Sequence, residues 1–142
     1  MRTPWEVAVF VYRGDRLLIL RRVGEQYWHV VAGVVEHGEG YVEAAGRELR
    51  EESGLDVGDR LIDLERPLTY ALTKEFRERY GFPPDQGVVT TYNFAAEAPS
   101  GWEPVLNEEH DAYRWCSFDE AASSLYWSSA RDIARELATR PR

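Results

Sequence analysis

The segment from residue 33 to residue 55 restricts the fold more than any other part of the chain, and it reads GVVEHGEGYVEAAGRELREESGL. Glycines punctuate its first part at positions 33, 38 and 40, and glycine adopts positive φ at little cost, which predicts a tight loop. The next apolar positions follow a helical period: Val42, Ala45 and Leu49. Gly54 stands where a helix C-terminal glycine is expected. The segment therefore predicts a glycine-rich loop that leads into one amphipathic helix.

Three carboxylates on this predicted helix break a rule of helix stability. Glu48, Glu51 and Glu52 stand at i, i+3 and i+4, so their side chains occupy neighbouring positions on one face. Like charges so placed repel each other, and the helix macrodipole disfavours negative charge in the last turns. Such violations are expected at functional sites, and a hard divalent cation would turn the repulsion into shared coordination. A solvated acidic face, which is common in acidic proteins, is the alternative interpretation.

The rest of the chain predicts a mixed α/β arrangement. Apolar runs at residues 7–12 and 17–20 flank the turn sequence RGDR, which predicts a hairpin. Further extended segments are expected at residues 28–32, 61–72, 87–96 and 112–118. Helix signals follow the last of these, with Asp119 as the expected cap and residues 130–137 as a C-terminal helix. The charged segment 73–86 is expected to be an exposed loop with a short helical turn.

Length and composition limit the classes of protein to consider. A chain of 142 residues has the length of about one domain, and without repeats or linkers we expect a single domain over residues 1–142. The net charge of −8 disfavours extended nucleic acid and anionic membranes as partners. Cys116 is the only cysteine, which excludes an internal disulfide and a Cys-rich zinc site, and we expect it to be buried. No apolar run approaches the roughly 18 residues of a membrane span, and a cytoplasmic location is expected.

Every defined position of the Nudix box is present in the glycine-rich segment. The box pattern is G-x5-E-x7-R-E-U-x-E-E-x-G-U, where U is an aliphatic residue, and the matching residues are Gly33, Glu39, Arg47, Glu48, Leu49, Glu51, Glu52, Gly54 and Leu55. So many fixed positions make a chance match improbable. The chain thus resembles the Nudix hydrolases. The resemblance implies an α/β fold with a mixed β-sheet sandwiched between α-helices, and hydrolysis that depends on Mg²⁺ or Mn²⁺.

The family pattern also implies roles for individual residues. It makes Glu48, Glu51 and Glu52 metal ligands, with the backbone carbonyl of Ala32 as a further ligand. Arg47 is expected to hold the carboxylate of Glu51 in place, although an ordinary i,i+4 ion pair explains the same spacing. Glu39 is expected to tie down the loop that precedes the helix.

A second acidic run, at residues 107–110, precedes the last predicted strand. Nudix enzymes often supply another carboxylate from a loop in this place. Glu109 is therefore expected to complete the metal site or to accept the proton of the attacking water. A solvated loop is the alternative, and Glu51 is the competing candidate for the general base. The histidines at positions 29, 37 and 110 are scattered and form no metal-binding motif.

Substrate contacts are expected from one arginine and several aromatic residues. Arg21 and Arg22 end a predicted strand, and family resemblance favours Arg21 as a ligand of substrate phosphate, although paired basic residues at a strand end are more often surface charges. Trp28, Tyr126 and Trp127 are candidates to stack on a base or pterin ring, with a place in the core as the alternative.

Flanking segments narrow the resemblance. Residues 27–39, 109–115 and 126–133 are similar to those of the bacterial dihydroneopterin triphosphate pyrophosphatases, also described as dATP pyrophosphohydrolases. The resemblance implies cleavage of a nucleoside or pterin triphosphate to a monophosphate and pyrophosphate. Oxidised nucleotides, ADP-ribose and dinucleotides are alternative substrates. A nucleotide-sensing module is the non-enzymatic alternative, which the intact REXXEE core disfavours.

Overall fold

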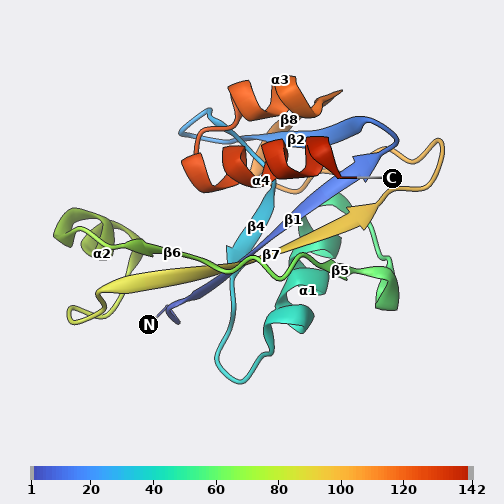
Figure 1. Cartoon of the computed structure of the whole chain (residues 1–142). Helices are drawn as coiled ribbons and strands as arrows, with labels where there is room; N and C mark the ends of the chain where they lie inside the picture. Colours follow the sequence, from blue (N-terminus) through green and yellow to red (C-terminus); the bar gives the residue numbers. More distant parts are fainter. Residues whose placement is uncertain (1, 141–142) are drawn as a thin grey trace.

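The centre of the sheet is a parallel pair of long strands. The computed structural model describes residues 2–140, and its strands form one eight-stranded sheet (Figure 1). β1 (Trp5–Arg13) runs parallel to β7 (Val88–Glu97) along nearly its whole length. β1 then turns into β2 (Arg16–Arg22), which pairs with it in antiparallel register. The predicted hairpin is confirmed.

The extended segment expected at residues 28–32 is two strands with different partners. β3 (Trp28–His29) pairs with β2, whereas β4 (Val31–Val34) pairs with the first half of β1. β2 and β4 both flank β1, one at its end and the other at its start. The chain therefore changes partner at Val30, and the expected single strand was wrong on this point.

The remaining strands extend the sheet on both sides of β1, and two short helices lie in the connections between strands. β5 (Ile62–Asp63) and β6 (Leu68–Ala71) pair with β7, and β8 (His110–Ser117) pairs with β2. The short 3-10 helix η1 spans Gly58–Arg60, and α2 spans Lys74–Tyr80. α2 is longer than the single turn expected in this segment, because Thr73 caps its N-terminus and Gly81 ends it in a left-handed conformation.

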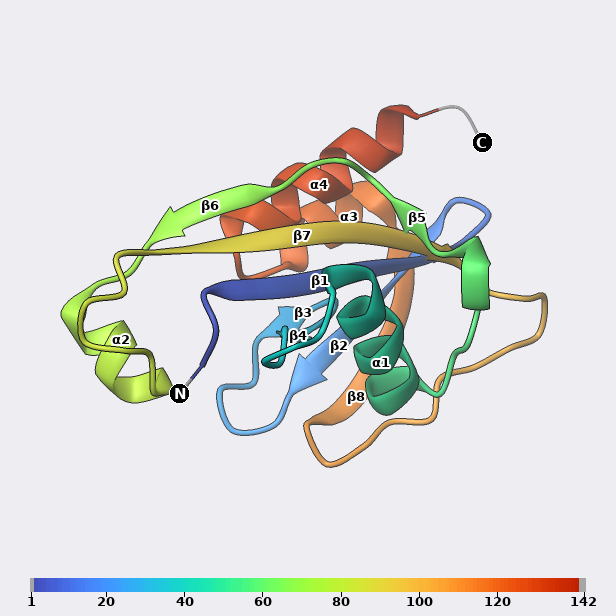
Figure 2. The same cartoon turned by 90° about the horizontal axis from the view of Figure 1, so that it is seen from below.

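Helices cover both faces of the sheet. α1 (Tyr41–Ser53) packs on one face, and α3 (Phe118–Ser124) and α4 (Ser128–Thr139) pack on the other (Figure 2). Side chains of β2 alternate between the two hydrophobic cores. Leu18 and Leu20 lie on the α1 side, whereas Leu17 and Ile19 lie on the side of α3 and α4. The expected mixed sheet between helices is confirmed.

The start of α3 differs from the sequence prediction. The Ser117 hydroxyl accepts a hydrogen bond from the Glu120 amide at 3.1 Å, and the Glu120 carboxylate accepts one from the Ser117 amide at 3.2 Å. Ser117 is thus the N-cap of a capping box, and the expectation for Asp119 was wrong. Asp119 lies in the first turn, where a negative charge interacts favourably with the helix dipole.

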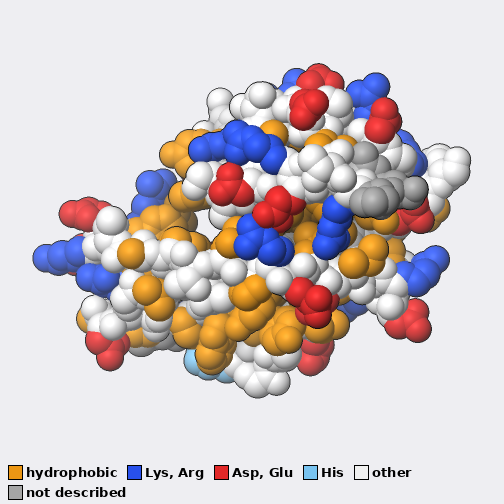
Figure 3. Space-filling view, viewed as in Figure 1, with side chains coloured by type: hydrophobic (Ala, Val, Ile, Leu, Met, Phe, Trp, Pro, Cys, Tyr) orange, Lys and Arg blue, Asp and Glu red, His pale blue; other side chains and the backbone are white. Residues whose placement is uncertain are grey.

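Charged side chains of both signs lie on the surface, and the one cysteine lies inside. Basic and acidic side chains interleave on the face shown in Figure 3, with apolar side chains gathered along its lower part. Cys116 is buried, as expected. Within residues 2–140, no helix has the length and apolar character to span a bilayer.

Candidate active site

Gly33 allows α1 to lie close against β4. A Cβ atom at this position would overlap the carboxylate of Glu48, which projects from the third turn of the helix. The Glu48 side chain is 10% exposed, and Arg47 donates a hydrogen bond of 2.7 Å to it. The first glycine of the loop therefore makes room for a buried carboxylate.

Glu52 is the most deeply buried carboxylate of the site. Its residue is 1% exposed, and its Oε1 accepts a hydrogen bond from the Ala32 amide at 3.2 Å. Its Oε2 is also buried but has no hydrogen-bond partner. Burial raises the pKa of Glu52 far above its usual value, and the neighbouring carboxylates of Glu48 and then Glu109 raise it further. A divalent cation fits this arrangement, because it would give the unpaired oxygen a partner and offset the repulsion.

Arg47 holds the loop, the strand and the helix together. Its guanidinium donates to both carboxylate oxygens of Glu39, at 2.8 and 2.9 Å, and to the Val34 carbonyl at 3.0 Å. It also reaches Glu48, whereas its contact with Glu51 is longer, at 3.4 Å. Hydrogen bonding from Arg47 lowers the pKa of Glu39. The principal partners of Arg47 are therefore Glu39 and Glu48, and the expected contact with Glu51 is the weaker one.

The three carboxylates of the helix do not share one environment. Glu48 and Glu52 are buried against the sheet side of α1, but the Glu51 side chain is 54% exposed. Glu48 and Glu52, at positions i and i+4, lie on the stripe of the helix that faces the sheet. Glu51 lies at the edge of that stripe, next to solvent. The structure thus brings two of the predicted ligands together with Ala32 and leaves the third facing solvent.

The loop before β8 brings Glu109 to the same place. The Glu109 carbonyl accepts a hydrogen bond from the Val23 amide at 2.9 Å, and its amide donates to the Asn107 side chain at 3.0 Å. One ligand atom each from Glu52, Glu109 and His110 lies within 4.8 Å of the others. The three histidines are scattered along the sequence and predicted no metal site, but the structure places His110 in this group with the two glutamates.

His29 is a second histidine on this side of the sheet. It pairs with Leu20, which lies on the α1 side, and its Nδ1 is buried without a hydrogen-bond partner. Burial, then the charges of His110 and Arg22, lower the pKa of His29 to about 4. Sequence reasoning missed both histidines, since they are far apart in the chain and only the pairing of β2 with β3 and β8 joins them.

The predicted substrate-binding residues form a separate group around β3. Arg21 forms an ion pair of 2.8 Å with Asp111, and both side chains are 40% exposed. Trp28 lies under the Arg114 guanidinium at 5.0 Å and packs against the core beneath α3 and α4. Tyr126 is 56% exposed and stacks on Tyr27 with 4.6 Å between ring centroids. Trp28 and Tyr126 are neighbours, because the Tyr126 amide donates to the Trp28 carbonyl at 3.0 Å.

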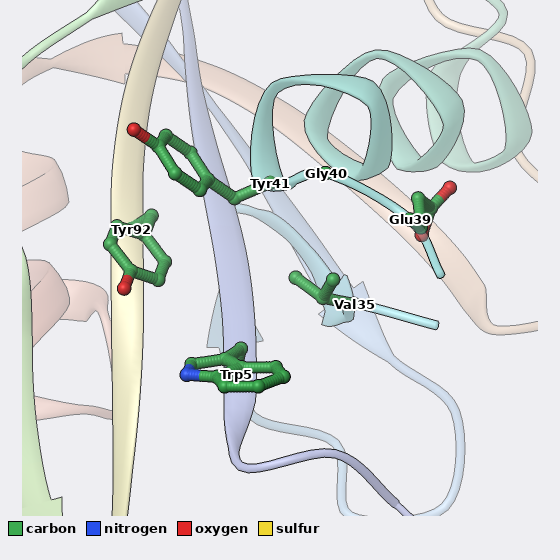
Figure 4. Close-up of a pocket in the computed structure, with 6 residues that line it drawn as sticks. All are labelled: Trp5, Val35, Glu39, Gly40, Tyr41 and Tyr92. Atoms are coloured by element: carbon green, nitrogen blue, oxygen red, sulfur yellow. The ribbon is translucent and has the colours of Figure 1, made fainter. Parts of the chain in front are cut away.

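A pocket of about 220 Å³ opens at the other end of α1 (Figure 4). Its walls include Trp5 and the ring pair Tyr41 and Tyr92, whose centroids are 4.4 Å apart. Glu39 is its acidic group and is already paired with Arg47. None of the predicted catalytic, metal or substrate residues lines this pocket.

Comparison with known proteins identifies the family. The model described as the NUDIX domain matches residues 2–137. The dihydroneopterin triphosphate diphosphatase of Escherichia coli (strain K12) is 32% identical over 140 residues, which cover 93% of this chain and 91% of that protein. The solved structure of the E. coli dihydroneopterin triphosphate pyrophosphohydrolase has a TM-score of 0.84 and 30% identity, with 96% of each chain covered.

A longer relative contains a similar segment. An octanoyltransferase of Myxococcus xanthus is 34% identical over 139 residues, which make up 95% of this chain. The chain spans only 36% of the length of that protein. The family model, the shared fold and the buried carboxylates against Gly33 agree, and the chain belongs to the Nudix family.

Proposed function

We propose that this Nudix hydrolase is a divalent-metal-dependent pyrophosphohydrolase that cleaves a nucleoside or pterin triphosphate into a monophosphate and pyrophosphate. The observation that carries the proposal is the buried, unpaired Oε2 of Glu52 beside Glu48 and Glu109. A buried carboxylate oxygen without a hydrogen-bond partner is costly, and a structural role alone does not account for it. The names of the E. coli relatives support a triphosphate of this kind as substrate.

The proposed metal ligands are the carboxylates of Glu48, Glu51, Glu52 and Glu109, with the carbonyl of Ala32. A bound Mg²⁺ or Mn²⁺ would supply charge neutralisation on the phosphates and a more acidic water. Arg47 acts through its neighbours, because it fixes the carboxylates of Glu39 and Glu48 and the carbonyl of Val34. Its proposed role is to keep the loop and the helix in register.

Glu109 is our proposed general base. It is exposed on a loop that is fixed by Val23 and Asn107, so its carboxylate reaches both solvent water and the site of Glu52. We expect Glu109→Gln to lower kcat by roughly 10² to 10⁴, as for loss of a general base, with a smaller change in KM. Steady-state kinetics at saturating metal measure this.

The neighbouring Glu108→Gln is the matched control, because Glu108 is also exposed on the same loop. It should leave kcat within about threefold of the wild type. If Glu109→Gln behaves like this control while Glu51→Gln is inactive, the base is Glu51.

Recognition of the substrate has to be local in this proposal. The net charge of −8 gives anionic substrates no general attraction, so the metal, one arginine and an aromatic surface must provide the affinity. Arg21, Trp28 and Tyr126 are the proposed contacts. Stacking on aromatic rings tolerates several bases, and we therefore expect moderate selectivity among triphosphates.

A substrate panel tests the proposed function. The untagged chain is incubated with Mg²⁺ or Mn²⁺ and dihydroneopterin triphosphate, the common deoxynucleotides, 8-oxo-dGTP, ADP-ribose or diadenosine polyphosphates, and products are resolved by ion-exchange chromatography. We expect dihydroneopterin triphosphate or dATP among the better substrates. A strong preference for ADP-ribose or a dinucleotide would overturn the substrate class. Binding of nucleotides without turnover would support a sensing module instead.

The proposal extends to location and organisation. A cytoplasmic location is supported by a chain whose one cysteine is buried. A single domain over residues 1–142 is supported by one sheet that runs through all described strands of residues 2–140.

A further inference from the structure

A β-bulge directs His110 toward the α1 side of the sheet. In β8, Cys116 belongs to the core beneath α3 and α4, and regular alternation would send residue 110 to that same side. The pairing with β2 is irregular, however, because Arg21 pairs with Ala112 and Arg22 with His110, which leaves Asp111 as the extra residue. Bulges often re-aim a side chain beside an active site. Here the bulge places His110 beside Glu52 of α1.

His110 is buried without full hydrogen bonding. The residue is 5% exposed, and its Nδ1 has no hydrogen-bond partner. The Glu52 carboxylate, 1% exposed, also keeps one oxygen unpaired in the same group. Glu52 and His110 thus each have a buried polar atom without a hydrogen-bond partner, which is unusual in a folded protein, and their side chains lie in one group that an ion could bridge.

The spacing of the group suits a single ion. One atom each of Glu52, Glu109 and His110 lies within 4.8 Å of the others. Ligands about 2.0–2.2 Å from one ion stand at most roughly 4.4 Å apart, and the exposed Glu109 has the freedom to close the difference. A histidine binds a metal through an unprotonated ring nitrogen, and one of the two imidazole nitrogens of His110 lies in this group.

We propose that His110 is a nitrogen ligand of the metal centre, and that it gives the site a preference for Mn²⁺ over Mg²⁺. The inference rests on the proposed metal-dependent function but concerns one ligand that the Nudix box does not contain. Carboxylates alone suit Mg²⁺ and Mn²⁺ alike, whereas an imidazole nitrogen favours a first-row transition metal over Mg²⁺. The site would then hold Mn²⁺ more tightly than a purely carboxylate site holds it.

Pulsed electron paramagnetic resonance of bound Mn²⁺ tests this ligand directly. The untagged full chain is loaded with Mn²⁺ in a buffer free of nitrogen ligands, and electron spin echo modulation reports any coordinated ¹⁴N. We expect a nitrogen signal in the wild type, its loss in His110→Gln, and its retention in His37→Gln, since His37 lies exposed in the loop before α1. Calorimetric titration should show at least about a tenfold loss of Mn²⁺ affinity in His110→Gln and a smaller loss for Mg²⁺.

Further variants keep the test decisive. If His110→Gln does not fold, labelling the wild type with [¹⁵N]histidine must change the modulation, and His29→Gln must keep it. A wild-type spectrum without nitrogen, or an unchanged one in His110→Gln, would overturn the inference. If the chain hydrolyses substrate with Mn²⁺ but gives no nitrogen signal, the His110 ligand is contradicted and the proposed function stands. If it gives a nitrogen signal but hydrolyses no substrate, the proposed function is contradicted and the His110 ligand stands.

Discussion

At the residue scale, the site depends on how closely a carboxylate can approach the backbone. Glu48 lies where a Cβ at Gly33 would be, and Arg47 holds it there. The glycine is therefore required by the close approach of a neighbouring side chain, and the sequence alone suggested only a tight loop. Glu52, in turn, accepts a hydrogen bond from the Ala32 amide, which links the helix to β4.

Gly33→Ala should weaken metal binding more than it weakens the fold. The new methyl group must displace the Glu48 carboxylate from its place beside Arg47, while the backbone of residue 33 has no positive φ to strain. We expect at least about a tenfold loss of Mg²⁺ or Mn²⁺ affinity in calorimetric titration, of the size seen when metal ligands lose their support. Gly40→Ala is the control, since its φ is −77° and nothing lies near the added methyl. Equal metal affinity in both variants would contradict this account of Gly33.

At the element scale, local patterns were reliable where one signal dominated. The hairpin from β1 to β2 and the helix α1, with its terminal Gly54, follow from turn chemistry and periodicity. The split of β3 from β4 and the bulge in β8 could not be predicted, because both depend on which strand lies alongside. His110 was missed for that reason, while the box glutamates were found through their local spacing.

The start of α3 offers a test of the corrected cap. Ser117→Ala removes the hydroxyl that accepts from the Glu120 amide and should lower the free energy of unfolding by about 1 kcal/mol. Asp119→Ala should cost less, about 0.3–1 kcal/mol, because it loses only the interaction of its charge with the helix dipole. Urea denaturation of the two variants gives the comparison. A larger loss of unfolding free energy in Asp119→Ala than in Ser117→Ala would indicate that Asp119 is the N-cap.

At the scale of the whole molecule, the two helical layers are joined through one sheet, and both cores draw on β1 and β2. This shared sheet is why one domain over residues 1–142 is proposed. The net charge of −8 gives an anionic substrate no general attraction, so the proposed function requires local positive charge at the site.

Thermal unfolding should show one cooperative transition, and bound metal should raise the Tm of that whole transition. Ligands that bind only the folded chain stabilise it by mass action, by about 2.7 kcal/mol at one hundred times the dissociation constant. We expect calorimetry to give a single peak that shifts upward with Mn²⁺ or Mg²⁺ and returns after chelation. Two separate peaks would contradict the proposal of one domain. A Tm that neither metal changes would contradict a preformed metal site.

In the proposed function, the carboxylate cluster directs metal-dependent cleavage at one bond of a triphosphate. Phosphorus NMR of the reaction with dATP or dihydroneopterin triphosphate follows that bond directly. We expect monophosphate and pyrophosphate in equal amounts from the wild type with Mg²⁺ or Mn²⁺, and turnover reduced by orders of magnitude in folded Glu52→Gln. Release of orthophosphate with a diphosphate, or undiminished turnover in Glu52→Gln or without metal, would contradict it.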